Sequence, residues 1–214
     1  MRHPIVLDAY LKGRRDMKLF NRTFVVAAAA VAGVSAQAVI VDFENLLNNG
    51  ISGFTLYGPT VNSGGFDFTS VTQVGPDAIA SWTADSPGFY TGSTAIFANY
   101  FTDSLDMTAA GGAVFSVTSI AMADVFLGST SDTITFTGTL PDLSTVQEFV
   151  QLTDGSSLQN YALTTMNGMI RININDSLSN DVQLDNIDAT VVPEPATLAV
   201  LGLGAVALLL RRRK

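Results

Sequence analysis

The residues that could carry out chemistry in this chain are almost all carboxylates. Nineteen of the 214 residues are Asp or Glu, and 16 of them lie between residues 39 and 192. The sequence has no cysteine, no lysine within 39–192, and a single histidine, His3. A thiolate nucleophile, a Ser-His-Asp triad, a histidine metal site and a Schiff-base lysine are therefore excluded for this segment. Carboxylate pairs, such as glycoside hydrolases use, are the one enzyme chemistry left open.

Exposed aromatic side chains beside carboxylates and amides are the residues that would bind a sugar. Trp82 is the only tryptophan, and Tyr90 and Tyr100 follow it in a stretch that reads as strand ends and loops. Their rings could stack on sugar rings. The alternative is that Trp82 covers the core, which is the more common position of a sole tryptophan.

The charge distribution excludes two classes of partner. Arg171 is the only basic residue between residues 39 and 192, so this segment carries a formal charge of −15. A segment with one cation cannot neutralise a run of phosphates, which excludes nucleic-acid binding. Binding of the same segment to an anionic membrane surface is excluded for the same reason.

The N-terminal region has the parts of a secretory signal peptide in the expected order. Lys18 and Arg22 precede an apolar run, 24–34, and Ala36 and Ala38 form an Ala-x-Ala signal for signal peptidase. We therefore expect residues 1–38 to be removed by the secretion machinery and its signal peptidase. Met17 is the start that we favour, because residues 1–16 are more polar than a usual n-region.

The C-terminal region reads as a short membrane segment followed by a basic end. Residues 196–210 carry no charge, and as a helix they would be about 22 Å long. Four cations follow and place that end in the cytoplasm. The anchor residues are Ala196, Leu198, Leu201, Leu203, Leu208 and Leu210, and the stop-transfer residues are Arg211, Arg212, Arg213 and Lys214.

The segment Val192-Pro193-Glu194-Pro195 precedes this apolar stretch. Prolines bar a helix there and keep the chain extended. This tripartite tail closely resembles the PEP-CTERM sorting signal of exported proteins of Gram-negative bacteria, which often make exopolysaccharide. The resemblance implies export across the inner membrane, a transient anchor, and recognition at residues 192–195 by an exosortase that delivers the protein to the cell surface or the medium. A simple tail anchor is the alternative.

The segment 39–192 predicts an all-β fold. Thr133–Thr137 and Ile170–Asn175 alternate apolar and polar residues, which is typical of half-buried strands. Further strands are expected over 39–43, 66–71, 95–97, 114–122, 146–152 and 182–191. Turn residues separate them, so we expect an antiparallel β-sandwich flanked by a signal-peptide helix and a C-terminal transmembrane helix.

Two of these strands lose their alternation and regain it one residue later. The apolar pattern slips between Val117 and Ile120, and again between Leu184 and Ile187. A β-bulge in each strand would restore the pattern. Arg171 is expected on a strand face beside an acidic neighbour, where an ion pair contributes little to stability.

The segment also resembles other PEP-CTERM exported domains. The shared features are Val41-Asp42-Phe43-Glu44 at its start, Gly112 to Ser116 in the middle, and Asp185-Asn186-Ile187 near its end. This likeness implies a jelly roll of the carbohydrate-binding-module type.

Four carboxylates at the two ends of the segment are candidates for a calcium site. Asp42 and Glu44 lie on the first expected strand, Asp185 and Asp188 lie on the last, and first and last strands commonly pair. Calcium requires six to eight hard oxygen ligands. The alternative is that Asp185 and Asn186 shape a bulge and the other carboxylates are exposed. No other cofactor is expected.

Three functions follow. The leading one is a non-catalytic surface or matrix protein sorted by its tail. The second is an envelope-displayed module that binds extracellular polysaccharide. The third, which the residue inventory makes remote, is a carboxylate-pair glycoside hydrolase.

Overall fold

The computed structural model describes residues 36–46, 53–82, 84, 86, 88–100, 103–128, 132–153, 155–176 and 182–192. Most of the expected signal peptide, the Pro-Glu-Pro sequence and the apolar segment 196–210 lie outside these residues. Among the residues described, no helix is long and apolar enough to cross a membrane.

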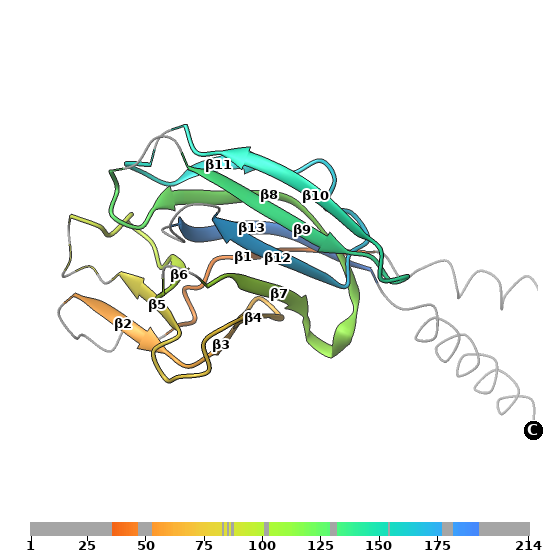
Figure 1. Cartoon of the computed structure of the whole chain (residues 1–214), viewed down its shortest axis with the longest axis horizontal. Helices are drawn as coiled ribbons and strands as arrows, with labels where there is room; N and C mark the ends of the chain where they lie inside the picture. Colours follow the sequence, from red (N-terminus) through yellow and green to blue (C-terminus); the bar gives the residue numbers. More distant parts are fainter. Residues whose placement is uncertain are drawn as a thin grey trace, which may run out of the picture. The chain divides into compact units, whose positions relative to one another are not determined.

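The described residues form an antiparallel sandwich of two sheets, so the all-β prediction is confirmed (Figure 1). The larger sheet has the order β11-β8-β13-β6-β5-β2, with β1 also paired to β13, and the smaller sheet has the order β10-β9-β12-β7-β4-β3. The strands are β1 Gln37–Val41, β2 Phe54–Tyr57, β3 Thr60–Ser63, β4 Phe66–Ser70, β5 Ile79–Trp82, β6 Ile96–Ala98, β7 Leu105–Ala109, β8 Val114–Asp124, β9 Thr133–Thr139, β10 Thr145–Gln151, β11 Gln159–Ala162, β12 Arg171–Asp176 and β13 Val182–Val192.

Each strand expected from the sequence is present, with its ends moved by one or two residues. Five further strands, β2, β3, β5, β7 and β11, were not expected. Each has four or five residues. Alternation over so few residues is too short a signal to identify a strand, and pairing with neighbouring strands of the sheet fixes them instead.

The two slips in the sequence pattern are bulges in one strand pair. The register of β13 on β8 shifts between Asp185 and Asp188 and again between Asp188 and Ala189. The first shift adds a residue to β13 at Asn186, whose φ of 44° is a left-handed conformation that asparagine tolerates. The second adds Thr118 to β8. Both predicted bulges are therefore confirmed, and they lie next to each other.

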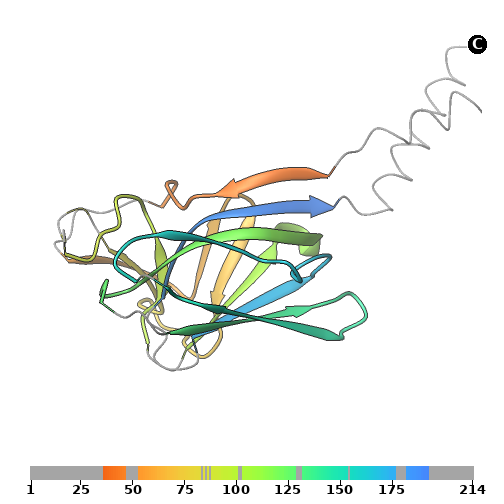
Figure 2. The same cartoon turned by 90° about the horizontal axis from the view of Figure 1, so that it is seen from above.

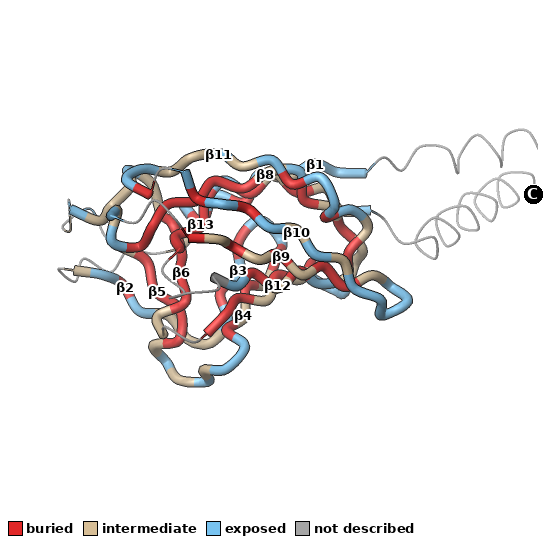
Figure 3. Tube along the Cα trace, turned by 45° about the horizontal axis from the view of Figure 1, so that its top comes forward, coloured by how far each residue is buried: buried red, intermediate tan, exposed pale blue. Residues whose placement is uncertain are grey.

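The main core lies between the two sheets, and buried stretches run through β5, β6, β8 and β13 (Figure 3). Phenylalanine rings interlock there: Phe43 meets Phe68 edge to face at 4.9 Å between centroids, and Phe66 meets Phe115 at 5.2 Å. Such edge-to-face pairs add about 1 kcal/mol to the burial of each ring. The core fixes the position of every strand that carries a candidate site.

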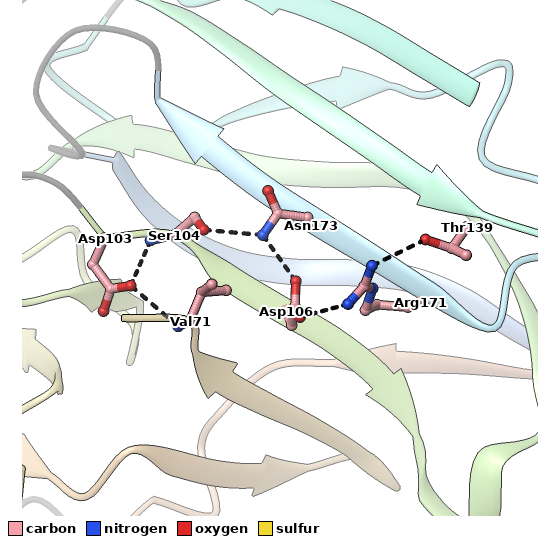
Figure 4. Close-up of polar contacts among 7 residues, drawn as sticks. All are labelled: Val71, Asp103, Ser104, Asp106, Thr139, Arg171 and Asn173. Carbon is pink, nitrogen blue, oxygen red and sulfur yellow. Dashed lines mark hydrogen bonds and ion pairs between the residues drawn. The ribbon is translucent and has the colours of Figure 1, made fainter. Parts of the chain in front are cut away.

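A row of polar contacts crosses part of the outer face of the smaller sheet (Figure 4). Arg171 on β12 lies 3.4 Å from Asp106 on β7, as expected for a cation on a strand face. Asp106 also accepts a hydrogen bond of 2.8 Å from Asn173, which donates to Ser104 at 3.0 Å. The arginine side chain is about half exposed, so the ion pair contributes little to stability.

Candidate functional site

An aromatic cluster lies on the outer face of the larger sheet. Ile79 of β5 packs into the main core, whereas its neighbour Ala80 packs into a separate small cluster with Phe97 and Val125, against which Trp82 is packed. Successive side chains of a strand point to opposite faces. Ala80 and Trp82 therefore face away from the core that lies between the sheets.

The fold brings rings from two strands, β2 and β6, and from two loop positions to Trp82. Phe54 of β2 is opposite Trp82 of β5 in the register. The centroid of the Trp82 ring lies 5.4 Å from that of Phe54, 4.7 Å from Phe89, 5.8 Å from Phe97 and 6.1 Å from Phe126. The indole N–H donates to the carbonyl of Val125 at 2.7 Å, which fixes the ring.

A shallow depression of about 180 Å³ opens beside this cluster. Its lining is mostly aromatic and consists of Phe54, Trp82, Phe97, Ala98, Asn99, Tyr100, Val125 and Phe126. Phe54 is 37% exposed and Phe126 is 47% exposed, so the rim presents apolar rings to solvent. Depressions of this kind bind the apolar faces of small ligands.

Asp77 fixes two polar residues at one side of the depression through hydrogen bonds. The hydroxyl of Tyr100 donates to its carboxylate at 2.6 Å, and the amide of Asn99 donates to its backbone carbonyl at 2.9 Å. The hydrogen bond to Asp77 raises the pKa of Tyr100, and burial adds to this effect. The phenol ring is therefore fixed at the edge of the depression, with its hydroxyl protonated at neutral pH.

The structure brings together two of the three aromatic residues suggested as sugar contacts. Trp82 and Tyr100 line one depression, and Tyr90 does not line it. The sequence did not identify Phe54, Phe97 or Phe126 as part of this site. These rings lie on β2, on β6 and in a turn, and only the order of the strands places them beside Trp82. A sugar role for any of these residues is untested.

A second candidate site lies where β1 ends beside β13. Asp185 of β13 is fully buried, and its carboxylate accepts hydrogen bonds from Ser93 and from the backbone and side chain of Asn186. Glu44 accepts a hydrogen bond of 2.8 Å from the backbone of Thr94. Consecutive residues of one loop thus bind carboxylates that are far apart in the sequence.

The pKa of Asp185 is raised to about 6, chiefly by burial and in smaller part by the charges of Glu44 and Asp42, while the hydrogen bonds from Ser93 and Asn186 oppose the rise. Glu44 and Asp42, two other predicted calcium ligands, therefore lie close enough to Asp185 to disfavour its charge. Asp188, the fourth, is half-buried opposite Ile40 and is not among the groups that shift this pKa.

No group of three or more His, Cys, Asp or Glu side chains is positioned to hold a metal ion in the described part of the chain. First and last strands do pair, as expected. The oxygens of Asp185, however, already accept hydrogen bonds within the protein. The carboxylates do not form a coordination shell in this arrangement, and calcium binding stays a prediction.

Thermal unfolding with and without calcium tests that prediction. If calcium binds the folded state only, a hundredfold excess over the dissociation constant adds about 2.7 kcal/mol to the free energy of unfolding, and the midpoint rises. A monovalent salt at equal ionic strength is the control, because screening alone stabilises an acidic protein. An unchanged midpoint at millimolar calcium removes the site.

We expect Asp185→Asn to stabilise the protein at pH 7. The folded pKa of about 6 exceeds the unfolded value of 3.8. The folded state therefore binds more protons than the unfolded state. The stability associated with the protonated Asp185 is fully present below about pH 4 and is lost as the pH rises past about 6. With allowance for solvent screening, the free energy of unfolding of the variant at pH 7 should be about 1–2 kcal/mol higher than that of wild type. The variant should also lack the fall in stability that the ionisation of Asp185 causes.

The measurement is urea unfolding of both proteins at pH 4 and at pH 7. The wild-type protein shares every other carboxylate with the variant, so the difference between the two isolates Asp185. A variant that is less stable than wild type at pH 7 would show that the carboxylate is stabilised there by its hydrogen bonds or by a cation.

Residues 191–214 match the PEP-CTERM protein-sorting motif. The match begins at the last two residues of β13 and covers the Pro-Glu-Pro sequence, the apolar segment and the basic end. The resemblance of the tail is thereby confirmed. No curated protein matches the chain.

Several solved structures share a loose likeness with the sandwich. A mutant of CBM29-2, a family 29 carbohydrate-binding module complexed with mannohexaose, is 9% identical and has a TM-score of 0.42, covering 73% of this chain and 93% of that one. A DUF4465 family protein from Bacteroides ovatus is 10% identical, with a TM-score of 0.41 over 74% of this chain and 100% of that one. TmCBM61 in complex with beta-1,4-galactotriose is 13% identical, with a TM-score of 0.36 over 58% and 86%. At such TM-scores nothing about function follows.

Proposed function

We propose that this chain is an exported, non-catalytic protein of the cell surface or extracellular matrix that an exosortase processes at its C-terminal tail. The sorting motif at residues 191–214 carries this proposal. From the sequence we expect Pro193 and Pro195 to bar a helix just before the apolar segment, and Arg211–Lys214 to stay in the cytoplasm. The enzyme therefore meets Glu194 outside the membrane.

The non-catalytic part of the proposal is supported by the residue inventory. Between residues 39 and 192 there is no imidazole, thiol or lysine amine. The carboxylates that do cluster, around Asp185, are engaged by backbone and hydroxyl donors of the protein itself. A glycosidase would instead need two carboxyl groups free to reach one sugar bond.

Cell fractionation of a host strain and of the same strain without its exosortase tests the sorting proposal. The protein should reach the surface or medium in the first strain and accumulate in the inner membrane in the second. An equal distribution in both strains would overturn it.

We propose as a second candidate that the exported protein binds polysaccharide through the depression beside Trp82. The support is its aromatic lining, with the fixed hydroxyl of Tyr100 and the amide of Asn99 at one side. Aromatic faces stack on the C–H faces of sugar rings, and polar groups orient them.

A glycan array probed with the purified exported form, with and without calcium, tests this candidate. We expect binding to a restricted set of neutral glycans, because the exported segment is strongly acidic. Retention of no glycan under either condition would leave the sorting proposal intact and remove the carbohydrate-binding one.

A further inference from the structure

The two ends of the sandwich domain are paired with each other. β1 and β13 run side by side and antiparallel, so the beginning of one lies beside the end of the other (Figure 2). Gln37 pairs with Val191, Ala38 with Thr190, and Val39 with Ala189. The start of the domain therefore holds the strand that leads into the sorting signal.

The expected signal-peptidase cut falls within this pairing. Cleavage after Ala38 removes two of the five residues of β1, Gln37 and Ala38, and leaves Val39–Val41 on β13. Both residues that would be lost are exposed, so their removal costs the core nothing. Removal of these two residues changes only the pairing of the neighbouring strand, β13.

The residues that lose their partner, Thr190 and Val191, are separated from the Pro-Glu-Pro sequence by Val192 alone. On their other side, Thr190 and Val191 pair with Ser116 and Phe115 of β8. Before the cut these two residues pair with β1 on one side and with β8 on the other, and after the cut they pair with β8 alone. Val192 is followed at once by Pro193, and only residues 193–195 separate it from the apolar segment, a distance of about 10 Å when extended.

We propose that removal of the signal peptide licenses processing of the sorting signal, because it opens the edge of β13 at Thr190 and Val191. This rests on the proposed function. Extended peptide segments are commonly recognised through backbone pairing along an exposed strand edge. Because only residues 193–195 lie between β13 and the membrane segment, an exosortase that binds residues 192–195 works directly against the end of β13. Gln37 and Ala38 occupy the edge of β13 beside that end until they are removed.

A pair of full-length variants in an exosortase-containing host tests the coupling. Ala36→Asp removes the small residue that signal peptidase needs and leaves Gln37 and Ala38 in place. Ala36→Asp/Gln37→Pro/Ala38→Pro is also uncleaved, but its prolines lack the N–H groups and the backbone freedom that pairing requires. All three positions are exposed, so the buried contacts of the domain are kept in both variants.

The readout is the fraction of chains that have lost the C-terminal tail, measured by mass at fixed times after synthesis. Ala36→Asp should be processed at least about tenfold more slowly than wild type, and the triple variant should recover the wild-type rate. Equal rates for wild type and Ala36→Asp would overturn the inference, as would a triple variant as slow as Ala36→Asp, since tethering by the uncut leader would then explain the delay. A wild-type chain that keeps its tail would instead refute the proposed function.

Discussion

Replacing Glu194 by alanine should leave an uncut precursor in the inner membrane and deplete the mature form at least tenfold. Glu194 lies between two prolines, which lack N–H donors and have a fixed φ. Its carboxylate is therefore the one charged group that an enzyme can recognise in this part of the tail. Fractionation followed by mass analysis of the C-terminus measures the result.

The tail-anchor alternative predicts a different outcome for the same variant. Residue 194 precedes the apolar segment and contributes nothing to its insertion, so Glu194→Ala would then leave the protein as it was. Asp142→Ala is the matched control, because it removes an exposed carboxylate from the turn between β9 and β10. We expect this control to be processed like wild type, and an identical defect in both variants would contradict a specific role for Glu194.

The second large effect is expected at the aromatic depression. If the exported form binds a glycan, Trp82→Ala should weaken that binding at least tenfold, about 1.4 kcal/mol, because the variant loses the ring around which the other aromatic residues pack. The same change should lower the free energy of unfolding by about 2 kcal/mol, since Trp82 is only partly buried. Calorimetric titration and urea unfolding measure the two effects separately.

Two further variants separate binding from stability. Trp82→Phe keeps an aromatic face while removing the N–H that donates to Val125, so it should retain more affinity than Trp82→Ala. Phe149→Ala removes a ring that is 64% exposed on β10 of the other sheet and should bind normally. Undiminished affinity in a folded Trp82→Ala protein, or loss of affinity in Phe149→Ala, would show that the glycan binds elsewhere.

Much of the fold could be predicted from local patterns. The slips in alternation at Thr118 and Asn186 identified two bulges, because a strand with one buried face must keep its apolar residues on that face. The pairing of the first strand with the last was likewise expected. These features depend on neighbours in sequence or on a common arrangement of chain ends.

The composition of the candidate sites could be predicted only in part, because it depends on the order of the strands. Trp82 and Tyr100 were identified by residue type, but nothing in the sequence places Phe54 opposite Trp82. The same holds for Asp185, whose bulge position was predicted, whereas its hydrogen bond from Ser93 and the proximity of Glu44 come from packing. The pairing of Gln37 with Val191 also became visible only in the sheet register.

We propose that the chain is exported and then released from its basic end. The most direct test is the intact mass of the protein recovered from the surface or medium of cells that contain an exosortase. We expect a chain that begins at Val39 and has lost Arg211–Lys214 together with the apolar segment. A mature protein that still carries Arg211–Lys214 would contradict it and leave only a short tail anchor.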